Sequence, residues 1–205
     1  MLLQKKIKIA LTGGIGTGKT FVSKQFLDKG VPVFYADDEA KKLYSSDKVL
    51  LFLKYNFGDK VFTDNLLDFS KLTNVVFSNI ENRKKIEALI HPLVMQQFEE
   101  WATQQRSNLV MLESALIFEA ELEHFFDKIV VVDAPLDIRI KRIKERNPAL
   151  TEAEILQRIH SQIPQEEKCK RADWVIWNGE ERCFKTLPIR KPPRLFRPAP
   201  DLICK

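Results

Sequence analysis

Residues 7–20 read IKIALTGGIGTGKT, an apolar run followed directly by a glycine-rich stretch that ends in lysine and threonine. The run Ile7–Thr12 has the length and composition of a buried strand, and Lys19–Lys29 carries apolar residues at helical spacing. Val31–Tyr35 follows as a second short apolar run. A strand, a glycine-rich turn, a helix and a second strand form a βαβ unit, and this unit predicts a parallel sheet.

The glycine-rich turn fits the phosphate-loop pattern Gly-x-x-x-x-Gly-Lys-Thr. Glycines allow the backbone to point its N–H groups into a concave nest at a helix N-terminus, where phosphate oxygens are stabilised. Lys19 adds a positive charge for the β- and γ-phosphates, and Thr20 offers a hydroxyl to Mg²⁺. We therefore predict that ATP or a related triphosphate is bound by the whole loop: Gly13, Gly14, Ile15, Gly16, Thr17, Gly18, Lys19 and Thr20.

Composition limits the class of protein. The 205 residues are 44% hydrophobic and 30% charged, as in a globular domain, and no apolar run approaches the ~20 residues of a membrane span. No signal segment is recognisable at the N-terminus, so we expect a cytoplasmic protein. The net charge of +5 comes from residues 181–205, which argues against a nucleic-acid-binding face on the fold. The three cysteines lack metal-ligand spacing and predict no disulfide framework.

Three later apolar runs read as strands separated by helical patterns: Leu109–Leu112, Ile129–Val132 and Trp174–Trp177. With the first two strands they predict an α/β fold of the P-loop NTPase type, a five-stranded parallel sheet flanked by helices. Helical patterns also occupy Leu136–Arg146 and Thr151–Gln162, and the second opens with a capping box formed by Thr151 and Glu154.

The segment after the second strand is helical in pattern, with no strand expected in it. Its helical stretches are Leu43–Phe57, Phe69–Phe77 and Glu81–Gln105. The last stretch contains His91-Pro92, and we predict a break there because proline suits the first turn of a helix better than the interior. The sequence thus predicts an all-helical insertion.

A pair of carboxylates follows the second strand. Asp37 and Asp38 come directly after Tyr35-Ala36, at the carboxyl edge of the predicted sheet, where ligands of such sheets bind. A carboxylate at this edge can accept a hydroxyl proton during phosphoryl transfer, or hold the metal and its water. The alternative is that one of the two aspartates caps the helix that follows. Spacing alone leaves both interpretations open.

Six motifs, in this order and spacing, resemble the dephospho-coenzyme A kinase family: LTGGIGTGKT, YADDEAKKL, LDFSKLTNVVF, LIHPLV, ALIFEA and ADWVIWN. The likeness covers roughly residues 7–180. It implies transfer of the γ-phosphate of ATP to the ribose 3′-hydroxyl of dephospho-coenzyme A, with Mg²⁺. Asp37 aligns with the catalytic base and, with Thr20, is the implied metal ligand. His91, Pro92 and Glu119 are the further residues implied for the acceptor.

The resemblance also implies a domain organisation. The nucleotide-binding core would comprise residues 1–39, 107–135 and 163–181, with a helical acceptor domain at 40–106 and a lid at 136–162. Arg142 as a catalytic residue and Arg146 as an ATP ligand match the arginines of the lid, although a solvated basic face is the alternative. Asn178 falls where the family packs adenine, and its alternative role is to end a strand.

Several positions depart from the family pattern. Arg139 stands where glutamine is usual, Asn147 where an acidic residue is usual, and Ala115 where proline is common. No Walker B aspartate is evident after the third strand. Two other functions therefore remain open: a kinase for a different alcohol or nucleotide, and a nucleotide-binding relative without turnover.

The likeness stops after Glu181. Residues 182–205 contain five of the ten prolines, which remove backbone donors and exclude an ordinary helix. We expect a poorly ordered tail that replaces the usual terminal helix, for example through an out-of-frame reading of the gene. The alternative is a genuine basic extension that docks a partner or an anionic surface.

Overall fold

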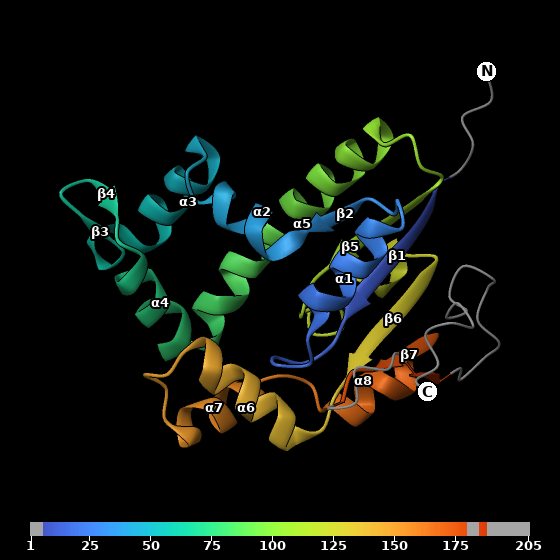
Figure 1. Cartoon of the computed structure of the whole chain (residues 1–205). Coiled ribbons are helices and arrows are strands. Elements are labelled where there is room, and N and C mark those ends of the chain that lie inside the picture. The colour runs from blue at the N-terminus through green and yellow to red at the C-terminus, as the bar shows by residue number, and fades with distance from the viewer. Residues whose placement is uncertain (1–5, 180–184, 188–205) are drawn as a thin grey trace. The chain divides into compact units, whose positions relative to one another are not determined.

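The computed structural model describes residues 6–179 and 185–187, and the chain divides into two compact units (Figure 1). Unit 1 comprises Met1–Phe34 and Gln105–Lys205, and unit 2 comprises Tyr35–Gln104. Unit 2 begins and ends within a few residues of the predicted acceptor domain. The predicted lid belongs to unit 1. Within the described ranges, no helix combines the length and the apolar composition needed to cross a bilayer.

The main sheet has the strand order β2-β5-β1-β6-β7-β8. Its strands are β1 Ile7–Thr12, β2 Val33–Tyr35, β5 Leu109–Glu113, β6 Lys128–Asp133, β7 Trp174–Trp177 and β8 Lys185–Leu187. The phosphate loop follows β1, which lies between β5 and β6 and pairs in parallel with both. The first five strands form the five-stranded parallel sheet that the sequence predicted.

Burial explains why these runs form the centre of the sheet. The four residues from Ile9 to Thr12 are 0–1% exposed, and Ile129–Val132 of β6 is buried throughout. Strands of a parallel sheet are covered on both faces, so they read as continuous apolar runs instead of alternating ones. The same continuity made these strands recognisable in the sequence.

The sixth strand, β8, was not predicted. Lys185–Leu187 pairs antiparallel with β7, with Trp177 opposite Lys185. These three residues fall within the segment predicted to be poorly ordered, which stays a prediction. They precede Pro188, so no proline interrupts the pairing, and an added edge strand is compatible with such a position. The rest of 182–205 lies outside the described residues, where the predicted tail stays a prediction.

The helices of unit 1 are α1 Lys19–Asp28, η2 Glu123–Phe125, α6 Leu136–Arg146, α7 Glu152–His160 and α8 Gln165–Arg171. Helix α7 begins with the predicted capping box. The Thr151 hydroxyl accepts from the Glu154 N–H, while the Glu154 carboxylate accepts from the Thr151 N–H. Helix α8 was not predicted, because seven residues rich in charge show no apolar period.

The helices of unit 2 are α2 Ala36–Leu43, α3 Asp47–Phe57, η1 Gly58–Lys60, α4 Phe69–Ser78 and α5 Ile80–Gln104. Helix α5 packs against α2 and against α4. The prediction of one helix over residues 43–57 was wrong. Helix α2 starts directly after β2, and the Ser45 and Ser46 amides turn back to the carbonyls of Lys42 and Leu43 before α3 begins.

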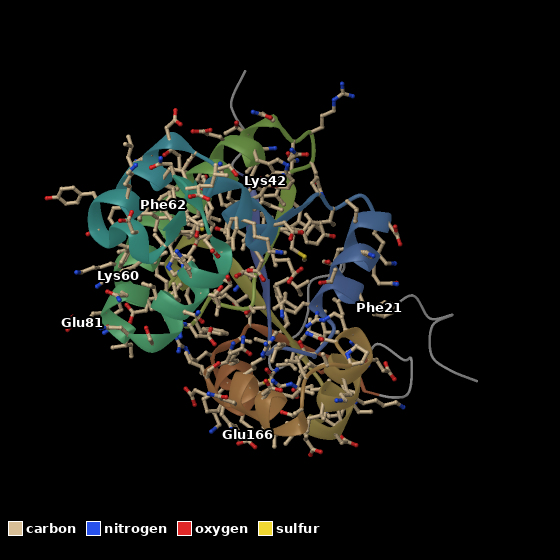
Figure 2. The ribbon with its side chains drawn as sticks, turned by 90° about the vertical axis from the view of Figure 1, so that its left-hand side faces the viewer. Phe21, Lys42, Lys60, Phe62, Glu81 and Glu166 are labelled. Carbon is tan, nitrogen blue, oxygen red and sulfur yellow. The ribbon has the colours of Figure 1, made fainter. Side chains whose placement is uncertain are left out.

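Unit 2 is not all-helical, contrary to the prediction. Phe62–Thr63 and Leu66–Leu67 form a two-stranded hairpin, β3–β4. Asp64 and Asn65 between them both have positive φ, 50° and 64°, as a two-residue type I′ turn requires. Phe62 is buried and Lys60, two residues before it, is exposed (Figure 2). The Asp-Asn pair was the sequence signal for this turn, but the flanking strands are too short to show alternation.

Helix α5 runs through the predicted break. Pro92 lies inside a helix of 25 residues, so the prediction of a helix boundary at His91-Pro92 was wrong. An interior proline lacks the N–H that would bond the carbonyl of Ala88, and such a loss bends a helix. Apolar residues on both sides of Pro92 are buried, among them Ile90 and Val94. This packing stabilises the helix across the missing hydrogen bond.

Candidate functional site

The carbonyl groups of the phosphate loop are held by donors around it. Lys19 Nζ donates to the carbonyl of Gly13 at 3.1 Å, and the Thr17 hydroxyl donates to that of Gly14 at 2.9 Å. Arg139 Nε donates to the carbonyl of Ile15 at 2.9 Å, and Asn178 Nδ2 donates to that of Thr17 at 2.8 Å. In a trans peptide the N–H points away from the carbonyl. Holding these carbonyls therefore fixes the direction of the N–H groups that follow them.

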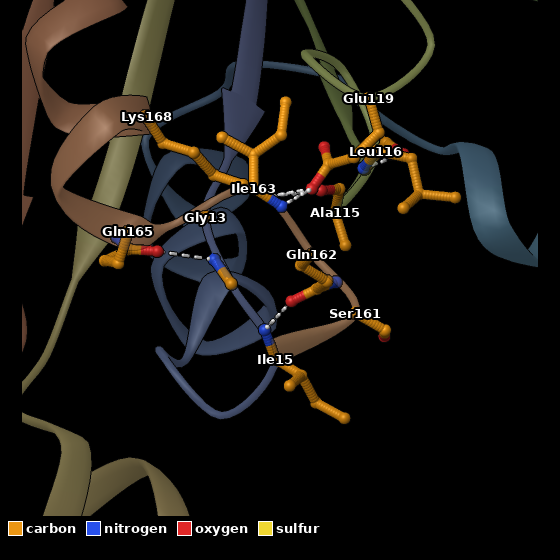
Figure 3. A network of polar contacts seen from close by, with 12 residues as sticks. Gly13, Ile15, Ala115, Leu116, Glu119, Ser161, Gln162, Ile163, Gln165 and Lys168 are labelled. Carbon is orange, nitrogen blue, oxygen red and sulfur yellow. Dashed lines mark hydrogen bonds and ion pairs between the residues drawn. The ribbon is translucent and has the colours of Figure 1, made fainter. Parts of the chain in front are cut away.

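The N–H groups of the loop differ in their partners, and that of Thr17 donates to the carbonyl of Gly14 at 3.3 Å. Those of Gly14 and Ile15 donate to the side-chain oxygens of Gln165 and Gln162, each at 2.8 Å (Figure 3). Those of Gly16 and Gly18 have no acceptor among the residues that the structure describes. N–H groups without acceptors at the start of a helix form an anion site, because both hydrogen bonding and the helix dipole favour negative charge. The loop has the features of a phosphate nest.

Glycine is required at position 16. Gly16 has a φ of 83°, in the left-handed region that other residues rarely adopt. A Cβ there would lie 2.7 Å from the carbonyl oxygen of Arg139 in α6. Close approach of α6 to the loop therefore depends on this residue.

The three arginines of α6 differ in their surroundings. Arg139 is 5% exposed and packs under the loop, where burial lowers the pKa of its guanidinium while Asp133 raises it. Arg142 is half-buried and donates to the carbonyls of Asn178 at 3.0 Å and Gly179 at 3.4 Å. Arg146 is exposed. For Arg139 and Arg142 the interpretation as a solvated basic face was wrong, because both donate to backbone carbonyls of the loop, Arg139 to Ile15 and Arg142 to Thr17.

Asn178 lies directly after a strand and also donates a hydrogen bond to the phosphate loop. It follows β7, its N–H donates to the carbonyl of Asp133 at 2.7 Å, and its side chain reaches Thr17. A Cβ on Gly18 would collide with the Asn178 amide nitrogen. Asn178 therefore lies against the half of the loop that begins α1.

Glu113 is a residue that the sequence analysis missed. It ends β5, is 7% exposed, and its Oε2 accepts a hydrogen bond from the Thr20 hydroxyl at 3.3 Å. A carboxylate and a hydroxyl together are oxygen ligands suited to Mg²⁺, which keeps several waters and needs few protein ligands. The described residues contain no group of three or more His, Cys, Asp or Glu able to hold a metal. The carboxylate at this strand end is a glutamate, whereas the expected residue was an aspartate.

Glu119 lies in a buried network behind the loop. Its Oε1 accepts from Lys168 Nζ at 2.6 Å and from the Ile163 N–H at 3.1 Å (Figure 3). Lys168 is 0% exposed and also donates to the carbonyl of Ala115 at 3.0 Å. Glu119 Oε2 is buried and has no hydrogen-bond partner among the described residues. Glu119 was predicted to bind the substrate that accepts the phosphate. One of its carboxylate oxygens instead forms an ion pair that holds α8 to the segment after β5.

We expect Lys168→Met to lower the free energy of unfolding by about 3 kcal/mol or more, because it leaves Glu119 buried without its cation. Thermal denaturation of the variant checks this. Lys170→Met, an exposed position on the same helix, is the matched control and should leave stability within about 0.5 kcal/mol. Equal stability of the two variants would contradict the role given to the buried pair.

Asp37 and Asp38, the pair of carboxylates predicted after the second strand, lie in the first turn of α2. The cap position of this helix is Tyr35, so capping by Asp37 or Asp38 was wrong as an interpretation. Both carboxylates are exposed, and the positive end of the helix dipole stabilises negative charge there. Asp38 pairs with Lys41 at 3.0 Å on the surface.

His91 lies in a polar neighbourhood of unit 2. Burial lowers its pKa, opposed by Glu87 and reinforced by Arg83, which favours the neutral imidazole. Arg83 and Glu87 pair at 2.7 Å on the same helix, and burial together with Glu87 raises the pKa of Tyr44. Pro92, beside His91, is exposed. A neutral imidazole here can exchange hydrogen bonds with a ligand but brings no positive charge.

One protein family has a sequence pattern that spans most of this chain. The model of the dephospho-CoA kinase family matches residues 7–182. A dephospho-CoA kinase of Bacteroides fragilis is 37% identical over 178 residues, 86% of each chain. A Thermus thermophilus protein of known crystal structure is 35% identical, with a TM-score of 0.78 over 86% of this chain and 90% of its own.

A second solved structure, the dephospho-CoA kinase of Campylobacter jejuni, is 26% identical and has a TM-score of 0.62 over 85% of this chain and 89% of its own. The family match spans the phosphate loop, both units and the last parallel strand. The chain belongs to the dephospho-CoA kinase family.

Proposed function

We propose that this protein transfers the γ-phosphate of ATP to the ribose 3′-hydroxyl of dephospho-CoA, giving CoA and ADP, the last step of CoA synthesis. The observation that carries the proposal is the phosphate loop, whose Gly16 and Gly18 N–H groups are without acceptors among the described residues. The chain belongs to the dephospho-CoA kinase family and has relatives of that name, and this membership is the reason for proposing dephospho-CoA as the acceptor of the phosphate.

In this proposal the loop binds the triphosphate and Lys19 follows its β- and γ-phosphates. Positive charge and directed N–H groups stabilise the negative charge that spreads over the transferred phosphoryl group. Thr20 and Glu113 would hold Mg²⁺, and Asp37 is the further predicted ligand. When bound, the metal neutralises charge on the phosphates. Arg142 and Arg146 line the nucleotide, and Asn178 contacts the adenine.

Asp37 is the proposed general base. Its carboxylate takes the proton of the 3′-hydroxyl as that oxygen forms a bond to the γ-phosphorus. The bond from the γ-phosphorus to the β,γ-bridging oxygen breaks, and ADP leaves with the electron pair. His91, Pro92 and Glu119 contribute to binding of the acceptor, His91 as a neutral hydrogen-bonding group.

The role of Glu113 predicts a change in metal dependence. Glu113→Gln keeps the side-chain shape but removes the charge, so we expect the Mg²⁺ concentration for half-maximal rate to rise by about tenfold. Rates measured across a Mg²⁺ titration at saturating ATP check this. Glu99→Gln, on α5 of unit 2, is the control. An unchanged titration curve for Glu113→Gln would remove this residue from the metal site.

A coupled assay of ADP release tests the proposed reaction. The purified chain is given ATP and Mg²⁺ with dephospho-CoA, with nucleoside monophosphates or with shikimate, and Lys19→Ala serves as the background for contaminating kinases. ADP release with dephospho-CoA alone supports the proposal. Release with another acceptor assigns a different alcohol or nucleotide kinase, and no release with any acceptor assigns a nucleotide-binding protein without turnover.

A further inference from the structure

Ile15 of the phosphate loop makes three separate contacts with one part of unit 1. Its N–H donates to Gln162 Oε1 at 2.8 Å, and its carbonyl accepts from Arg139 Nε at 2.9 Å. Its side chain packs on an apolar cluster formed by α6, α7 and the turn between them. All three contacts come from residues 136–162, called here the 136–162 segment. The N–H, the carbonyl and the side chain of Ile15 thus all contact this segment.

The apolar cluster is the core of the segment. Its members are 0–8% exposed: Ile143, Leu150, Ile155 and Ile159. Two partly buried residues pack against it, Ile140 from α6 and Ile15 from the loop. Among the described residues of this cluster, Ile15 alone comes from outside the segment. The loop therefore inserts a side chain into the small core that holds α6 to α7.

Ile15 differs from the phosphate-facing residues of the loop in the hydrogen bonding of its N–H group. Its N–H is already donated to Gln162, whereas the next N–H groups, of Gly16 and Gly18, have no acceptors within the described part of the chain. A phosphate seated on those groups fixes the peptides on the C-terminal side of Ile15. Fixing them also fixes Ile15, because a planar peptide joins it to Gly16.

We propose that Ile15 is a positioning residue that couples the 136–162 segment to the phosphate loop, so that nucleotide bound in the loop stabilises the segment and the ordered segment tightens nucleotide binding. The two effects are equal in size, because coupling between two sites is reciprocal. The proposal rests on the proposed function only in that the loop binds a nucleotide. Binding of nucleotide in the loop thereby stabilises α6, whose Arg142 and Arg146 are proposed to line the nucleotide.

Hydrogen exchange of the full chain, with and without saturating ADP, tests the coupling. In the wild-type protein we expect ADP to slow exchange in peptides from the 136–162 segment by about tenfold. Ile15→Ala removes the side chain from the cluster, and we expect the ADP effect to fall below about threefold. Binding of ADP to each variant is measured by calorimetry, so that every comparison is made at full occupancy.

Ile140→Ala is the matched control, because it removes an isoleucine side chain of α6 from the same cluster and leaves every residue of the loop unchanged. We expect faster exchange of the segment with and without ADP but an ADP effect of wild-type size. The proposal is overturned if Ile15→Ala keeps the full effect, if Ile140→Ala loses it equally, or if the wild-type segment does not respond to ADP.

Gln162→Met carries the test if Ile15→Ala does not fold. It keeps the length of the side chain but removes the acceptor of the Ile15 N–H, and Gln157→Met on the exposed face of α7 is its control. A reduced ADP effect in Gln162→Met alone supports the coupling, and a wild-type effect overturns it. Because only ADP is used, failure to phosphorylate dephospho-CoA would defeat the proposed function and leave this test intact.

Discussion

Lys19→Ala is expected to lower the rate of phosphoryl transfer by about 10²- to 10³-fold, the loss typical when one preorganised donor to a developing charge is removed. Lys19 is the cation of the phosphate loop, and its Nζ lies 3.1 Å from the carbonyl oxygen of Gly13. The ammonium is therefore held within the loop before nucleotide arrives. The coupled assay at saturating ATP and dephospho-CoA gives the rate.

Lys24→Ala is the matched control for this variant. Lys24 lies one turn further along α1 and is exposed, so its removal changes the net charge by the same amount. We expect its turnover to stay within about twofold of wild type, since surface changes away from the site have small effects. Near-normal turnover of Lys19→Ala would refute the assignment of the loop.

Asp37→Asn is expected to lower kcat by at least about 10²-fold, because an amide cannot take the hydroxyl proton. The substitution keeps the shape of the side chain in the first turn of α2. The dissociation constant for ATP should remain within about threefold of wild type, since a base acts in the transition state and adds little to nucleotide binding. Steady-state kinetics and ATP titration measure the two quantities separately.

The neighbouring carboxylate provides the control. Asp38→Asn removes the same charge from the same helical turn, but Asp38 is paired with Lys41 on the surface. We expect its kcat to be close to that of wild type. If Asp37→Asn weakens ATP binding and leaves kcat unchanged, Asp37 is a metal or structural residue and the general base lies elsewhere.

The parallel sheet could be predicted because its strands are continuous apolar runs. Ile7–Thr12 and Trp174–Trp177 were predicted with the bounds that the structure has. The capping box of α7 was equally local, since both of its partners lie within four residues. Elements set by pairing or packing at a distance were missed, such as β8, whose three residues form a strand only beside β7.

In the candidate site, too, the local features could be predicted and the contacts between distant residues could not. The phosphate loop follows from local sequence, because its glycines and Lys19 are contiguous. Gln162 and Gln165 could not be recognised, since they meet the loop from about 150 positions further along the chain. Lys168 stands among charged residues in the sequence, and only its contact with Glu119 reveals a buried cation.

The contact between Arg139 and Ile15 bears on which sequences this fold can accept. Within the part of the chain that the structure describes, the guanidinium donates through Nε to a backbone carbonyl. A glutamine side chain, usual at this position in the family that the sequence resembles, also carries an N–H that can donate to a carbonyl. The position therefore favours a side chain that can donate a hydrogen bond to the Ile15 carbonyl. Natural variation at residue 139 should exchange arginine with glutamine and exclude glutamate and leucine, which cannot donate.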